Sequence, residues 1–424
     1  MKSSELKDVY KNHPCFNSIT KCFEEKSSAK FHIKNLAGAQ SALIATQSVK
    51  SIRRPQFFIL NDKEEAAYFL NDLETLLQKK ALFYPSSYRR PYQLEETDNA
   101  NILLRTEVLN SLNHRNLPII VSYPEAILEK VISQEQLKNN SLDIQVNDSI
   151  SIDFLNDCLQ EYHFELVDFV IEPGQYSIRG GIVDIFSFSN ELPYRIEFFD
   201  EDVESIRTFD INTQRSKDKQ KKVSIVPRFP IFSDKAQESI LEFLPKNSKV
   251  WIVDVDSTRA KLNDFYEKAT SHFNTIKDNT VSHIEPEKLF LDGDNFIKQL
   301  HNFGVVEFGN QFYFEADESY EFRSSPQPVF NKQFDLLIDD LEDSHKKGYN
   351  NFILCSGKEQ INRFDSIIQD FEKEVHFTPI LLSLSKGFID HQQKICFYTD
   401  HQIFERYHKF HLKTSFANNN AITL

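Results

Sequence analysis

Two hydrophobic patterns alternate along the first 123 residues of the chain. Compact apolar runs at 55–60 and 117–123 are typical of buried strands, whereas 62–80 carries apolar residues at the spacing of an amphipathic helix. Strands that alternate with helices in this way predict an α/β layer around a mostly parallel sheet. The same alternation resumes at residue 223, and a further α/β stretch begins near residue 329.

The pattern changes between residues 124 and 222. Short strand-like segments follow one another here and are joined by short turns, which predicts a compact, mainly antiparallel α+β unit. The sequence "EPGQ" at 172–175 has Pro second and Gly third, the signature of a type II β-turn. The charged run "RSKDKQKK" at 215–222 is interpreted as a solvated linker rather than a DNA contact, because no aromatic residues are interleaved with its lysines.

These changes of pattern divide the chain into four segments. An α/β domain occupies 1–123 and resumes at 223–328, and the α+β unit at 124–222 is inserted into it. A small α/β domain and the start of a linker follow at 329–424. The length of 424 residues fits this division, since it predicts about three domains at roughly 100–200 residues each.

Composition narrows the classes of function. The net charge of −14 disfavours broad, non-specific binding of nucleic acid. The five cysteines include no CxxC pair, which suits a reducing cytoplasm and offers no zinc site. No apolar run approaches the ~20 residues of a membrane helix, so we expect a cytoplasmic protein with no membrane partner.

A degenerate phosphate loop is predicted at 34–46, "KNLAGAQSALIAT". When this stretch is aligned on G-x-x-x-x-G-K-[ST], Lys34 and Ala39 occupy the glycine positions and Gln40 occupies the lysine position. Only Ser41 is retained. Without the glycines and the lysine, the loop can neither wrap nor neutralise nucleotide phosphates. The sequence therefore predicts a nucleotide-binding fold that no longer binds nucleotide, and no cofactor for this chain.

No other group of residues in the sequence has the spacing of a catalytic or metal-binding site. His408 and His411 are three residues apart, yet no Cys, Asp or Glu completes a ligand set beside them. We find no nucleophile paired with a base. The sequence therefore predicts no catalytic residues and no metal site.

The segment 176–199 is the strongest candidate for a binding surface. We interpret it as two strands around a turn, with Gly180 and Gly181 inside the first strand, where glycines would let a partner approach closely. Alternation places Ile178, Ile182 and Phe186 on one face with Gly180, and Arg179, Gly181, Val183 and Ile185 on the other. In the second strand, Tyr194, Ile196 and Phe198 face the core, and Arg195, Glu197 and Phe199 face outward.

Two interpretations of this outward face remain open at this point. Arginine and exposed aromatic residues are enriched at protein interfaces, which favours a docking surface. Alternatively, Arg195 and Glu197 form a solvent-exposed ion pair and Phe199 packs under a loop.

The same residues carry a resemblance to a known family. The stretches "EPGQYSIRGGIVDIF", "ELPYRIEFFDEDVESIRTFD" and "INTQRS" resemble the UvrB-like N-terminal region of the bacterial transcription-repair coupling factors. UvrB itself is similar but typically has Arg-Gly-Asp where this chain has Arg179-Gly180-Gly181. The late stretch "KICFYTDHQIFERYHK" and the degenerate loop at 34–46 also resemble the coupling factors, so the resemblance covers nearly the whole chain.

The resemblance implies a fold and a binding site. The α/β domain would be RecA-like with a degenerate P-loop, the insert would bind UvrA, and the last domain would be flavodoxin-like. Family members use the arginine of the Arg-Gly-Gly strand and the Arg-x-Glu-x-Phe strand for this contact. Carried onto this chain, the UvrA-binding residues are Arg179, Arg195, Glu197 and Phe199, with Gly180 and Gly181 at the interface.

The resemblance also implies which activities belong to this chain and which belong to the rest of a longer protein. The chain would be an N-terminal fragment that recruits UvrA to stalled RNA polymerase and performs no catalysis. The parts that bind RNA polymerase and translocate on double-stranded DNA with ATP and Mg would lie beyond residue 424. The family's C-terminal domain masks the UvrA-binding face, which we therefore expect to be open here. The stretch 83–104 is too short for UvrB's damage-probing hairpin, so damage verification is not expected.

Two alternatives to recruitment stay under consideration. One is a UvrB-like repair protein that binds or hydrolyses nucleotide through the loop at 34–46, against which Gln40 argues. The other is a structural clamp that holds the motor of the complete protein inactive.

Overall fold

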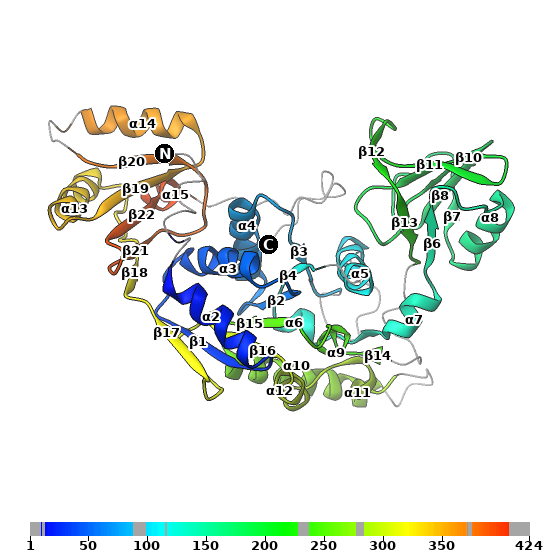
Figure 1. Cartoon of the computed structure of the whole chain (residues 1–424), viewed down its shortest axis with the longest axis horizontal. Coiled ribbons are helices and arrows are strands. Elements are labelled where there is room, and N and C mark those ends of the chain that lie inside the picture. Colours follow the sequence, from blue (N-terminus) through cyan, green and yellow to red (C-terminus); the bar gives the residue numbers. More distant parts are fainter. Residues whose placement is uncertain are drawn as a thin grey trace.

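The architecture was obtained from a computed structural model, shown in Figure 1. The residues it describes are 10, 13–87, 99–114, 117–227, 237–276, 284–369, 371 and 375–406. Within these residues the chain is a mixed α/β protein with both parallel and antiparallel sheets, which confirms the α/β class. Figure 1 shows a central layer with one smaller unit at each end.

A seven-stranded sheet forms the central layer, in the order β17-β1-β16-β15-β2-β4-β3. Every neighbouring pair in it is parallel. Its strands come from two distant parts of the chain, 30–122 and 249–321. The strands are β1 (Lys30–Lys34), β2 (Gln56–Ile59), β3 (Leu82–Phe83), β4 (Ile119–Ser122), β15 (Lys249–Ile252), β16 (Gly304–Glu307) and β17 (Glu318–Glu321).

Helices and short bridging strands connect and cover this sheet. The helix predicted at 62–80 is α4 (Lys63–Leu77), which begins where the Asp62 carboxylate accepts a hydrogen bond from the Glu65 amide at 2.8 Å. The others are α2 (Pro14–Glu25), α3 (Gln40–Ser51), α5 (Asn99–Asn113), α6 (Pro124–Ile127), β5 (Val131–Ile132), α7 (Gln134–Asn139), β14 (Gln237–Glu238), α9 (Ile240–Phe243), α10 (Val255–Ile276), α11 (Pro286–Leu289) and α12 (Gly293–Leu300).

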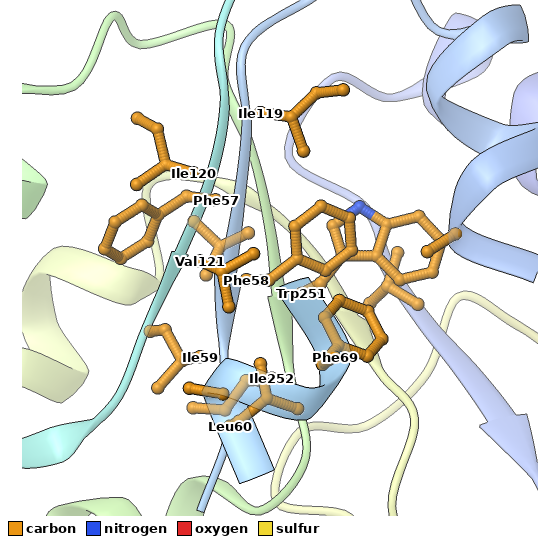
Figure 2. Close-up of a cluster of buried hydrophobic side chains, with 14 of the residues drawn as sticks. Phe57, Phe58, Ile59, Leu60, Phe69, Ile119, Ile120, Val121, Trp251 and Ile252 are labelled. Atoms are coloured by element: carbon orange, nitrogen blue, oxygen red, sulfur yellow. The ribbon is translucent and has the colours of Figure 1, made fainter. Parts of the chain in front are cut away.

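The middle of the sheet is apolar on both faces. Phe57 and Phe58 are adjacent in β2 and both are fully buried, as expected for a strand of a parallel sheet covered by helices. Figure 2 shows Phe58, Trp251 and Phe69 packed together, and the Phe58 and Trp251 rings stack at 5.4 Å. The buried indole N–H donates to the Gln56 side-chain oxygen at 2.7 Å, so this core contains no unsatisfied tryptophan.

The insert has a sheet and a core of its own. The six strands run in the order β12-β11-β10-β9-β8-β7, antiparallel except for the β7–β8 pair. Helix α8 (Ile152–Glu161) contributes Leu155 and Leu159 to the buried cluster on one face of this sheet. The strands of this sheet are β7 (Glu165–Leu166), β8 (Gln175–Arg179), β9 (Ile182–Ile185), β10 (Tyr194–Phe199), β11 (Asp202–Phe209) and β12 (Ser216–Gln220). Strands β6 (Leu142–Gln145) and β13 (Lys222–Ile225) form a separate two-stranded antiparallel sheet.

Two local predictions for the insert have different outcomes. The turn at 172–175 is confirmed, because Gly174 has φ +88° and the Gln175 amide donates to the Glu172 carbonyl at 3.2 Å. The prediction of a charged linker at 215–222 is wrong, because these residues form edge strand β12 and the start of β13. Strand β12 pairs only with β11, and lysines at a sheet edge discourage pairing with other chains.

The last unit is a small mixed sheet with helices. Its strand order is β18-β21-β22-β19-β20, with parallel pairs around β19 and antiparallel pairs around β21. Helix α13 ends near Gly348, whose φ of +81° suits glycine. The elements are β18 (Ser324–Pro326), α13 (Phe334–Lys346), β19 (Asn350–Cys355), α14 (Lys358–Gln369), β20 (Thr378–Leu381), β21 (Phe388–Asp390), β22 (Ile395–Thr399) and α15 (Asp400–Ile403).

Some predictions fall outside the described residues. His408, His411 and the C-terminal linker lie there, as does the stretch 88–98 within the segment compared with the UvrB hairpin. Among the helices that are described, none is long and apolar enough to cross a membrane.

Candidate functional site

Gly180 and Gly181 form a tight turn between two strands. Arg179 at the end of β8 is paired with Ile182 at the start of β9, so the two glycines connect an antiparallel hairpin. Gly180 has φ +60°, a conformation that favours glycine in such turns. The prediction that these glycines lie inside one continuous strand is therefore wrong.

The two glycines have different surroundings. A Cβ atom at Gly181 would lie 2.8 Å from the Phe198 carbonyl oxygen, so this glycine lets the molecule's own strand β10 approach the turn. A Cβ atom at Gly180 would have nothing within 4 Å. Only Gly180 thus leaves room toward the outside.

The turn reverses the chain and changes which side chains share a face. Val183 and Ile185, predicted to lie beside Arg179, are instead buried in the core of the insert. Ile182 pairs with Arg179 and Glu197, away from that core. Phe186, also predicted to face the core, packs in a separate cluster with Val170, Phe209 and Leu103 of α5.

Strand register nevertheless brings the four predicted residues to one side of the sheet. Arg195 and Glu197 pair with Asp184 and Ile182 of β9, and Ile182 pairs with Arg179. We call this side the arginine face; it carries Arg179, Asp184, Arg195, Glu197, Phe199 and Arg207. The opposite side packs on the core of the insert.

A buried carboxylate organises the arginine face. Asp184 is inaccessible to solvent and accepts hydrogen bonds from Arg195 Nε at 2.7 Å and Arg195 Nη2 at 2.8 Å. Arg179 Nη2 donates to the same carboxylate. These bonds to Asp184 raise the pKa of Arg195 above its usual value. One buried anion therefore holds two arginines in fixed positions.

Arg195 is enclosed by further contacts. Its Nη1 donates to the Gln214 carbonyl at 3.1 Å, and its guanidinium lies 4.6 Å from the centre of the Phe209 ring. Its side chain is 16% exposed. Arg195 thus belongs to the framework of the face and offers little of its own surface.

The outer part of the face is formed by the other predicted residues. Phe199, at the end of β10, is 77% exposed, and Arg179 is partly exposed beside the turn. Glu197 accepts hydrogen bonds from Arg207 and from Ser205 Oγ. The alternative interpretation does not fit the described residues, because among them Phe199 is exposed rather than packed and Arg195 pairs with Asp184.

The sequence prediction missed Asp184 and Arg207. A signal for Asp184 was present, because alternation puts it on the same face as Ile182 and Phe186, and a carboxylate among apolar side chains needs a partner. Arg207 is found only through register, since it lies opposite Arg195 on β11.

The degenerate loop at 34–46 is occupied by side chains and backbone of the chain itself. Gln40 is fully buried, and its Nε2 lies 3.3 Å from Asp390 Oδ2 and 3.4 Å from the Tyr10 hydroxyl. Its Oε1 accepts a hydrogen bond from the Ala37 amide at 3.3 Å. Burial and the nearby Asp390 carboxylate raise the pKa of Tyr10. The Gln40 amide and the Asp390 carboxylate therefore occupy the position at which a phosphate loop would place its lysine.

Backbone of the last unit also contacts this loop. The Ala39 amide at the start of α3 donates to the Lys386 carbonyl at 3.1 Å. A Cβ atom at Gly38 would lie 2.4 Å from the Gly387 carbonyl oxygen, and Gly38 has φ +50°. We call residues 385–387 the strap. Ser41 retains only a weak bond of 3.5 Å to the Gly38 carbonyl, and Lys34 lies 5.7 Å from the Phe312 ring centre.

Similarities to known proteins bear on the insert and on the whole chain. Residues 142–229, which contain the six-stranded sheet, match the family described as UvrB interaction domain. The transcription-repair-coupling factor of Bacillus subtilis is 25% identical over 417 aligned residues, covering 84% of this chain and 35% of that protein. The Haemophilus influenzae factor is 22% identical, with 65% and 28% covered. This chain is similar to the transcription-repair-coupling factors over most of its length.

The predicted resemblance to the coupling-factor family is therefore confirmed. A factor from Staphylococcus aureus is 40% identical over a shorter stretch of 91 residues, which is 22% of this chain and 8% of that protein. The chain spans about a third of the length of the Bacillus subtilis relative. The arginine face lies entirely within the UvrB interaction domain, at residues 142–229.

Proposed function

We propose that the UvrB interaction domain of this chain docks the repair protein UvrA through the arginine face, and that the chain recruits UvrA to stalled RNA polymerase. The observation that carries this proposal is Phe199, which is 77% exposed on the same face of the sheet as the arginines held by the buried Asp184. An exposed aromatic ring beside fixed charges is the composition of an interface hot spot.

Preorganisation supports the same proposal. The cost of ordering side chains is a large part of what opposes association. Here Asp184 fixes Arg179 and Arg195, and Glu197 fixes Arg207, before any partner arrives. The face can therefore bind with little further loss of side-chain entropy.

We further propose a RecA-like core, a flavodoxin-like last unit and no catalysis by residues 1–424. The strap supports the last point, because the amide of Ala39 and the side chain of Gln40 are already hydrogen-bonded within the chain. Contacts with RNA polymerase and DNA, and ATP-driven translocation with Mg, would belong to other parts of a longer protein. We propose a cytoplasmic location, where such partners reside.

Binding to purified UvrA, measured by isothermal titration calorimetry, tests the proposal. We expect Phe199→Ser to weaken binding by about 2 kcal/mol or more, roughly 30-fold, because it removes a hot-spot side chain. Phe154→Ser is a matched control, since Phe154 is 53% exposed but lies on α8, which covers the opposite side of the sheet. Absence of binding by the unaltered chain, or equal affinity of the Phe199 and Phe154 variants, would contradict the proposal.

A further inference from the structure

Exposed apolar side chains are concentrated on the UvrB interaction domain. Of the nine large hydrophobic residues exposed in the described part of the chain, five lie within 142–229, which is why this domain is the place to seek a larger contact. Phe199 is one of them. Phe169 and Ile171, in the segment between β7 and β8, are 61% and 50% exposed.

The segment that carries Phe169 is fastened onto the arginine face. The Asp168 carbonyl accepts hydrogen bonds from Ser177 Oγ at 3.1 Å and from Arg179 Nη1 at 3.4 Å. The Arg179 guanidinium also lies 5.5 Å from the centre of the Phe169 ring. One arginine thus joins the buried Asp184 to the exposed Phe169.

Val170, in the middle of this segment, points inward and holds the segment in place. Val170 is fully buried in the small cluster with Phe186 and Phe209, and its carbonyl accepts a hydrogen bond from Gln214 Nε2 at 3.4 Å. Phe169 and Ile171 flank Val170 and are directed outward as a result. Single exposed hydrophobic residues are ordinary on protein surfaces, but this pair is held in place beside a charged network.

We propose that the UvrA-docking surface has a second apolar anchor, formed by Phe169 and Ile171, in addition to Phe199. This inference rests on the proposed function, since it extends the same surface toward the same partner. Strands β8 and β10 are separated by one strand, so the strands next to the two anchors lie roughly 10 Å apart, well within one protein interface. The partner therefore presents two apolar sites with polar groups between them.

The charges around the surface specify the partner further. Glu165, Asp168 and Glu172 are exposed around the Phe169 anchor. At the other edge of the sheet, Lys219 of β12 pairs with Arg207 of β11, so two cationic side chains are neighbours there, with Arg207 also bonded to Glu197. The matching surface of UvrA carries cationic groups opposite 165–172 and acidic groups opposite Arg207 and Lys219, and this asymmetry sets the orientation of docking.

Calorimetric titration of UvrA with the full chain tests the second anchor. Phe169→Ser is expected to lower affinity about tenfold or more, as Phe199→Ser does, because both remove exposed apolar surface from one contact. Leu166→Ser is the control within the same segment. Leu166 is also exposed, but it pairs with Tyr176 and so lies on the side of the core rather than of the arginine face.

The outcomes separate this inference from the proposed function. Loss of affinity in the Phe169 and Phe199 variants, with Leu166→Ser unchanged, supports two anchors. Loss in the Phe199 variant alone overturns the second anchor and leaves the proposed function intact. Unchanged affinity in both phenylalanine variants overturns both, and equal loss in the Leu166 and Phe169 variants overturns the assignment to the arginine face. Identical thermal unfolding of all variants verifies that each one is folded.

Charge reversal provides an independent measurement. Glu165→Lys together with Glu172→Lys is expected to slow association with UvrA, and the effect should shrink as salt is added. An association rate that does not change at low salt would overturn the predicted orientation.

Discussion

Asp184 is the residue on which the arginine face depends. A carboxylate without access to solvent is costly unless its charge is compensated, and here Arg195 and Arg179 supply the compensation. The arrangement places two cations at the surface in fixed positions. It also means that Arg195, one of the four residues predicted to bind UvrA, has a structural role.

Replacement of Arg195 should therefore lower stability as well as binding. We expect Arg195→Ala to reduce the free energy of unfolding of the insert by about 2–3 kcal/mol, because it leaves a buried carboxylate with a single partner. Urea denaturation measures this loss. Arg179→Ala is the comparison, with a smaller expected loss of about 1 kcal/mol because Arg179 is more exposed. Equal stability of the Arg195 variant and the unaltered chain would contradict the framework role.

The strap is the element that connects the last unit to the degenerate loop. Its Ser385 donates hydrogen bonds to the Asp72 carboxylate of α4, from the backbone amide at 2.8 Å and from the hydroxyl at 2.5 Å. Asp72 is almost completely buried. Burial raises the pKa of Asp72 to about 7, although the bonds from Ser385 and the charges of His401 and Lys386 act in the opposite direction.

This raised pKa makes the stability of the strap contact depend on pH. Between the ordinary pKa of an unfolded aspartate and about 7, the folded chain binds the proton more tightly, so stability falls as pH rises. We expect the difference in unfolding free energy between the unaltered chain and Asp72→Asn to change by about 1 kcal/mol per pH unit from pH 5 to 7. Urea titrations at several pH values measure it. Parallel stability curves for the two proteins would contradict the assignment.

The described residues pack into four hydrophobic clusters, of which the largest surrounds the seven-stranded sheet and another lies within the last unit. Phe352, Leu354 and Phe397 of the last unit belong to the same core cluster as the seven-stranded sheet. The insert has a core of its own, which includes Leu155, and a small cluster with Leu103 of α5 joins it to the main body. Figure 1 shows this insert standing at one end of the molecule.

Separate cores predict separate unfolding transitions. Leu155→Ala should lower the stability of the insert by about 2–5 kcal/mol and shift only one transition in differential scanning calorimetry. Leu73→Ala, in the core of the seven-stranded sheet, should shift the other. A single transition that both variants displace equally would show that the insert and the main body unfold as one unit.

Much of the fold followed from local patterns in the sequence. Apolar runs such as 117–123 became central strands and the amphipathic run at 62–80 became α4, because burial on both faces or on one stripe imposes those patterns directly. The alternation in 194–199 likewise placed Arg195, Glu197 and Phe199 on one face. Charged strand β12 escaped prediction because an exposed edge strand has no apolar side to reveal it.

What alternation could not reveal was the reversal at Gly180 and Gly181. A two-residue turn leaves the run of polar and apolar residues uninterrupted, and only pairing between strands shows that Arg179 lies beside Ile182. The sequence by itself determined most elements, the resemblance to the coupling factors and the outward position of Arg195, Glu197 and Phe199, because these depend on neighbours along the chain. The tertiary structure alone decided that Asp184 holds the arginines, that the strap contacts the degenerate loop and that Phe169 joins the arginine face. Each of those contacts joins residues from different elements, and their energies arise only when the elements are packed together.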